Sequence, residues 1–153
     1  MTPFFRILNR LSTATIIALS VLFDLATSVV FSLFATPNNK IDGLEISVLE
    51  KLFIIAIVAP AVETYFFQFL IIKYLKKYAN SLVALVVSAL AFSAAHTYSL
   101  AYIAKTLIAG LEYGILFIYF SEKFNYRYAY LAVVTSHCIY NLLGFTLSHY
   151  QII

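Results

Sequence analysis

Long runs of apolar residues, separated by short polar segments, make up most of the chain. Five of these runs are close to the roughly 20 residues that an α-helix, rising about 1.5 Å per residue, needs to cross the hydrocarbon core of a bilayer. Lipid offers no hydrogen-bond partners to the backbone, so such segments fold as helices. The pattern predicts an all-α, polytopic membrane helix bundle with spans at residues 11–35, 52–72, 81–99, 100–120 and 128–148.

The composition supports a membrane protein. The chain is 63% hydrophobic and 11% charged, whereas soluble domains carry about 25% charged residues. No repeat or long linker divides it, which predicts a single domain over residues 1–153. The net charge of +3 is small, and its basic residues form no stripe, so no nucleic-acid partner is expected.

The basic residues of the loops predict the orientation. Counting Lys and Arg alone, the rule that cytoplasmic loops are positive places the N-terminus in the cytoplasm and the C-terminus outside. We expect an integral multi-pass protein of the plasma membrane. The residues behind this orientation lie before the first span and after the second and fourth: Arg6, Arg10, Lys73, Lys76, Lys77, Lys123 and Arg127.

Polar residues inside the spans are the candidates for function, because a charge at the centre of a bilayer costs at least about 2.5 to 3.5 kcal/mol. Glu63 stands within the apolar and aromatic stretch "AVETYFFQFL". Asp24 and Glu112 are interpreted as bracing the bundle, together with Lys105, which lies two turns before Glu112. The full set in the predicted spans is Asp24, Glu63, Gln68, His96, Lys105, Glu112, His137 and Asn141.

Helical spacing brings some of these residues together. "HCIYN" sets His137 and Asn141 four residues apart on one face of the last span, and "FSAAH" sets Phe92 below His96 in the same way. Pro60 removes a backbone donor three residues before Glu63, which predicts a loosened or kinked helix beside the carboxylate. A polar cavity within the bundle suits such a helix better than lipid does.

These residues carry a resemblance. Glu63 in "PAVETYFFQ", His96 in "FSAAH" and the pair in "HCIYN" resemble, in this order, the three motifs of the CPBP family, also called Abi. This is the CAAX-protease and bacteriocin-processing family of intramembrane endopeptidases. Its pattern is Glu-Glu-x-x-x-Arg, Phe-x-x-x-His and His-x-x-x-Asn, matched here over residues 60–141. "GLEYG" also resembles the glycine-spaced helix of the family.

The chain departs from the family in its first motif. Thr64 and Gln68 stand where the family has its second Glu and its Arg. Both charges of a pair four residues apart are replaced by neutral groups that can still hydrogen-bond. We interpret this change as a variant of a structural brace, with Thr64, Gln68 and Phe92 supporting the site.

The resemblance implies hydrolysis of a peptide bond within the membrane. Glu63 would be the general base on a water that His96 positions, while His137 and Asn141 would stabilise the oxyanion. The substrate would be a peptide or membrane protein in the lipid bilayer, and an oligomer is possible. A metallo-endopeptidase is left open beside a glutamate-type protease, with Glu63, His96 and His137 as ligands of a zinc ion.

Two other classes of function remain open. A non-catalytic bacteriocin immunity or binding membrane protein would keep the bundle and tolerate the loss of Glu63. A small proton-coupled transporter would use Glu63, Glu112, Asp24 and the histidines as a relay across the membrane. A protease instead requires Glu63, His96 and His137 within reach of one water.

Overall fold

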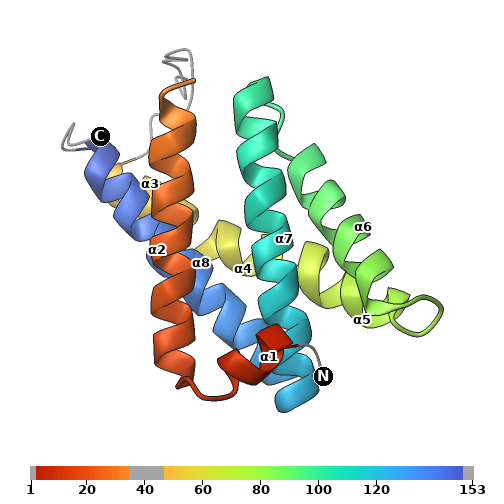
Figure 1. Ribbon diagram of the computed structural model, residues 1–153. Helices are drawn as coiled ribbons and strands as arrows, with labels where there is room; N and C mark the ends of the chain where they lie inside the picture. The colour runs from red at the N-terminus through yellow and green to blue at the C-terminus, as the bar shows by residue number, and fades with distance from the viewer. Residues whose placement is uncertain (1–2, 35–46, 150–153) are drawn as a thin grey trace.

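Helices form nearly all of the chain in the computed structural model, which describes residues 3–34 and 47–149 (Figure 1). No strand occurs in these residues, so the predicted all-α fold is confirmed. Five consecutive segments, α3 to α5 with two π-helical turns η1 and η2, form one continuous helix over Val48–Leu75. The elements are α1 (Pro3–Leu8), α2 (Thr13–Ser32), α3 (Val48–Phe53), η1 (Ile54–Val58), α4 (Ala59–Glu63), η2 (Thr64–Leu70), α5 (Ile71–Leu75), α6 (Ser81–Ala94), α7 (Leu100–Lys123) and α8 (Tyr126–His149).

Within the described residues, four helices are long and apolar enough to span a membrane: Thr13–Ser32, Val48–Leu75, Leu100–Lys123 and Tyr126–Leu147. The predicted span at 81–99 is wrong in length, because α6 has 14 residues and is about 21 Å long. The chain leaves the helix after Ala94, and Ser99 then caps α7 by accepting a hydrogen bond from the Tyr102 amide. Residue 35, the predicted end of the first span, lies outside the described residues.

Large apolar side chains cover the outward faces of the helices. Helices of a soluble protein would turn such side chains inward, whereas a bilayer solvates them. The protein is therefore an integral membrane protein; its orientation and its membrane remain predictions. Examples of these exposed side chains are Leu22, Phe23, Phe53, Phe66, Leu82, Leu90 and Leu131.

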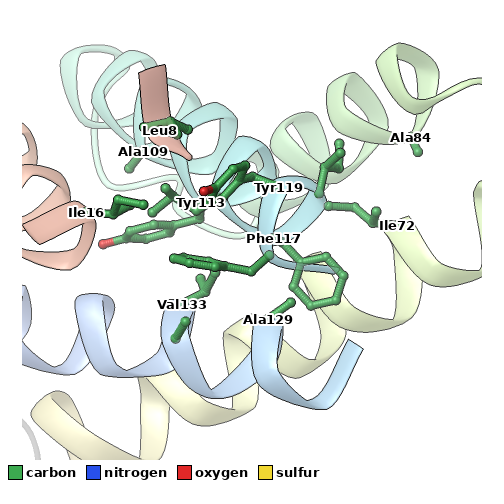
Figure 2. Close-up of a cluster of buried hydrophobic side chains, with 14 of the residues drawn as sticks. Leu8, Ile16, Ile72, Ala84, Ala109, Tyr113, Phe117, Tyr119, Ala129 and Val133 are labelled. Atoms are coloured by element: carbon green, nitrogen blue, oxygen red, sulfur yellow. The ribbon is translucent and has the colours of Figure 1, made fainter. Parts of the chain in front are cut away.

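Helix α7 is the centre of the bundle. In its most apolar window 61% of the residues are buried, against 22% for each of the other three spans. Phe117 and Tyr113 of α7 pack between Val133 of α8 and Ile16 of α2, and Leu8 of α1 closes one end of this core (Figure 2). A functional group that packs against the buried face of α7 is therefore shielded from lipid.

Helix α6 approaches α7 closely at a glycine. A Cβ atom built on Gly110 would lie 3.0 Å from the Cα of Ala89 and 3.2 Å from its carbonyl oxygen. The neighbour is backbone, so only a shift of the whole helix could make room. By contrast, a Cβ atom built on Gly144 of α8 would have no other atom within 4 Å.

We expect Gly110→Val to destabilise the protein by about 1 to 3 kcal/mol, the usual cost of overpacking. Gly144→Val is the matched control, because it places the same side chain in a helix without a neighbour, and it should change stability much less. Thermal unfolding in detergent measures both variants. Equal losses would mean that the close approach of α6 and α7 has no energetic weight.

Candidate active site

The helix that carries Glu63 is widened on both sides of it. Glu63 ends the short α4, between η1 and η2, whose wider turns are common at functional sites. The amide of Ala59 bonds back to the carbonyl of Ile54, five residues earlier, and the next residue, Pro60, has no amide hydrogen. This geometry agrees with the predicted loosening at Pro60.

Side chains of neighbouring helices bind backbone carbonyls along this widened helix. Such donors are needed within a membrane, where no water satisfies a carbonyl that faces lipid or a bundle interior. Two of the three come from α8 and one from α6, so they also fix the rotation of the helix. Asn141 donates to Ile55 (2.9 Å), Tyr130 to Ala61 (3.1 Å) and Ser88 to Phe67 (2.9 Å).

Glu63 lies between two imidazoles. Its Oε1 is 3.8 Å from Nε2 of His96, and its Oε2 is 3.7 Å from Nε2 of His137. The side chains are 26%, 14% and 5% exposed for Glu63, His96 and His137. Both distances exceed a direct hydrogen bond and suit one bridging water. The three residues from the three motifs are thus brought together.

His96 lies just beyond the last residue of α6, and a hydrogen bond sets its tautomer. Its Nδ1 is 2.7 Å from the carbonyl oxygen of Phe92. A carbonyl can only accept, so Nδ1 carries the hydrogen, and in the neutral ring Nε2 presents a lone pair to Glu63. His96 is therefore placed to accept a proton on the side that faces the carboxylate.

Aromatic rings hold both imidazoles. The Phe92 ring centroid lies 4.6 Å from that of His96 and 6.0 Å from that of His137. The Tyr113 ring lies against the other side of the site. Its centroid is 4.7 Å from that of the His137 ring, and the two ring planes are tilted by 33°. Phe92 was predicted from its spacing to His96. Tyr113 was not, because nothing in the sequence distinguishes it from the other tyrosines.

The remaining predicted site residues lie around this centre without joining it. Asn141 uses an amide hydrogen to bind Ile55 of η1. Thr64 and Gln68 are fully buried, yet the Thr64 hydroxyl and both polar atoms of the Gln68 side chain have no hydrogen-bond partner in the described part of the chain. The neutral pair therefore does not reproduce a brace between two charged groups.

We expect Gln68→Met and Thr64→Val to stabilise the protein, by about 1 to 3 kcal/mol each at most, since each removes a buried polar group without a partner. Thr135→Val is the control, because Thr135 is exposed and bonds to the Leu131 carbonyl. Denaturation in detergent measures the change. A loss of stability in the first two variants would reveal a partner for these groups.

No group of three or more His, Cys, Asp or Glu side chains in residues 3–34 and 47–149 is arranged to hold a metal ion. The zinc set considered from the sequence, Glu63, His96 and His137, thus lacks the geometry of a preformed site. Asp24 and Glu112 gather on the far side of Tyr113, which contacts the histidine side through its ring.

An apolar groove of about 390 Å³ opens between α3, η1 and α8. Cys138 belongs to its wall, and the groove reaches toward the exposed faces of these helices. Neither Glu63 nor the two histidines line it. Its lining residues are Leu49, Leu52, Phe53, Ala56, Ile57, Cys138, Ile139 and Leu142.

Comparison with known proteins gives one family. The family model described as "Type II CAAX prenyl endopeptidase Rce1-like" matches residues 44–143, close to two thirds of the chain. The matched range includes Glu63, His96, His137 and Asn141. No curated protein and no solved structure matches the chain.

Proposed function

Because the chain belongs to the Rce1-like type II CAAX prenyl endopeptidases, a family of CAAX-type intramembrane proteases, we propose that it cleaves peptide bonds within the membrane with Glu63 as the base that activates water. The observation that carries this proposal is the position of the Glu63 carboxylate between the Nε2 atoms of two histidines, at 3.7 and 3.8 Å.

Water binds between Glu63 and His96 in this mechanism. Both groups accept hydrogen bonds, since Nε2 of His96 carries a lone pair, so a water molecule can donate one hydrogen to each. The water oxygen forms a bond to the carbonyl carbon of the substrate while one of its protons passes to Glu63. A general base of this kind contributes about 10² to 10⁴-fold to a rate.

His137 acts on the other side of the carboxylate. In the tetrahedral intermediate the former carbonyl oxygen is negative, and an imidazole N–H can stabilise it without a permanent cation. The C–N bond then breaks as the amine nitrogen takes the proton from Glu63. Asn141 positions His137 in this scheme, because its bond to Ile55 ties α8 to the helix of Glu63.

The substrate is a membrane-associated peptide. We propose that the apolar groove between α3, η1 and α8 holds an apolar chain attached to the peptide or an apolar segment of it. The groove residues belong to the two continuous helices that also carry Glu63 and His137.

The test uses purified full-length protein in lipid nanodiscs with a panel of fluorogenic peptides: prenylated CAAX peptides, the same peptides without the lipid, and bacteriocin leader peptides. We expect cleavage of prenylated peptides above that of their unlipidated counterparts. A parallel set with a chelator separates the two protease types, because a glutamate-type protease keeps its activity. Activity that is lost with the chelator and activity that is kept bear on the type of mechanism alone, and either result leaves the assignment as a protease intact.

Absence of cleavage by a folded protein would overturn the proposal. The non-catalytic immunity protein is then tested by protection of cells from a bacteriocin, and it predicts protection that survives Glu63→Gln. Proton uptake by liposomes that hold the protein tests the transporter in the same preparation.

A further inference from the structure

A second polar cluster lies buried between α2 and α7, apart from the groups of the proposed reaction. Asp24 is fully buried and accepts a hydrogen bond from the Tyr113 hydroxyl at 2.5 Å. The Asp24 and Glu112 carboxyl groups interact electrostatically with each other. The remaining oxygens, Oδ1 of Asp24 and Oε2 of Glu112, have no donor in the described part of the chain.

Two ionised carboxylates that act on each other inside the bundle would be both repulsive and unsatisfied, because like charges repel more strongly there than in water. Ionised carboxylates only accept hydrogen bonds, whereas a protonated one also donates. A proton on one of the two acids therefore removes the repulsion and turns it into the missing donor for the other.

Lys105 supplies the balancing positive charge. It is 6% exposed and acts electrostatically on both acids. Its ammonium donates to the Tyr140 hydroxyl of α8 at 2.6 Å and lies 4.3 Å from the centre of that ring. One shared proton leaves the two acids with a single negative charge, so the cluster with Lys105 is neutral, as a buried group in a membrane must be to avoid a large cost.

We propose that Asp24 and Glu112 form a buried binding site for one proton, shared between the two carboxyl groups and balanced by Lys105. The titratable groups that act on the pair come from α7: Tyr113 and Lys105. His137 and Tyr140 of α8 lie behind these two, His137 against the Tyr113 ring and Tyr140 at the Lys105 ammonium. Tyr113 links this site to the active site, since its hydroxyl binds Asp24 while its ring packs on His137. Through Tyr113 the proton site positions His137. This positioning role rests on the proposed function, whereas the binding of the proton does not.

Infrared spectroscopy tests the proton site without any assay of activity. In nanodiscs at about pH 8, where exposed carboxyl groups are ionised, we expect a band of one protonated carboxylic acid that disappears in Asp24→Asn and in Glu112→Gln. The measurement is made in a Glu63→Gln background, so the active-site acid does not contribute. Two substitutions are used because one of them could fail to fold.

Three results would overturn the proton site. The first is the absence of any protonated carboxyl band in the parent protein. The second is a band that vanishes when sodium replaces choline in the buffer, because the pair would then bind a monovalent cation. A band that persists through both substitutions belongs to another acid and is equally contrary.

The positioning role has its own readout. Tyr113→Phe removes the hydroxyl that binds Asp24, and we expect it to lower kcat about tenfold at unchanged KM, which corresponds to about 1.4 kcal/mol, and to shift the imidazole ¹⁵N resonances of His137. Tyr119→Phe is the control: Tyr119 is as buried as Tyr113, but its hydroxyl binds Asn9. Unchanged His137 resonances in Tyr113→Phe would contradict the role while leaving the proton site standing.

Discussion

Glu63→Gln should lower the rate of peptide cleavage by about 10² to 10⁴-fold, the contribution of a positioned general base. Glutamine has nearly the shape of glutamate and still accepts a hydrogen bond, but it takes up no proton from water. The fold should persist, because the Glu63 side chain is 26% exposed and its oxygens lie 3.7 and 3.8 Å from the histidine nitrogens, beyond a direct hydrogen bond. Initial rates at saturating substrate, with thermal unfolding of the same sample, measure both effects.

Glu122→Gln is the matched control for this substitution. Glu122 is 49% exposed and pairs with Lys76 at 2.7 Å, and surface pairs of this kind contribute about 0 to 1 kcal/mol. We expect it to leave the rate unchanged. Full activity of Glu63→Gln would remove the carboxylate from the mechanism and favour a different base.

His96→Asn should abolish most of the activity while preserving the fold. The asparagine amide can occupy the place of Nδ1 and donate to the Phe92 carbonyl, so the end of α6 keeps its hydrogen bond. It has no counterpart of the basic Nε2 that faces Glu63. We expect a loss of at least about 100-fold in kcat with a change in stability below about 1 kcal/mol.

The dependence of the rate on pH shows whether His96 acts through Nε2 or only through the hydrogen bond that closes α6. If Nε2 takes part in proton transfer, the pH dependence of kcat should differ between the wild type and His96→Asn. An unchanged profile and rate would mean that His96 only closes α6. His96→Gln is informative beside it, because its longer amide lies nearer the place of Nε2 without being basic.

Much of the fold and the centre of the site could be predicted from the sequence. Helices follow from long apolar runs, because a membrane allows few alternatives to a helix. Glu63, His96 and His137 were expected to meet because each is a polar residue within a predicted apolar span and because the three stand in the order of the family's three motifs.

The contacts that depend on how helices rotate and cross could not be predicted. The apolar run at 81–99 gives no sign that the helix ends at Ala94, since the reversal depends on Ser99 capping α7. Likewise, Asp24 and Glu112 could be interpreted as braces, but their meeting depends on which faces of α2 and α7 pack together. Gln68 has no hydrogen-bond partner in the described residues because none of the side chains around it places a donor or an acceptor within reach. The sequence alone does not show which side chains these are.

The two wide turns beside Glu63 have a consequence for how this protein can evolve. A π-helical turn accommodates one extra residue while the helix before and after it keeps its direction. Loss of Ile57 from η1 would therefore restore ordinary helical spacing and leave the carboxylate facing the histidines. Loss of one residue from the regular α8 ahead of His137 would rotate the imidazole by about 100°. Insertions and deletions should thus be tolerated in the span of the base and rejected in the helix of its partner.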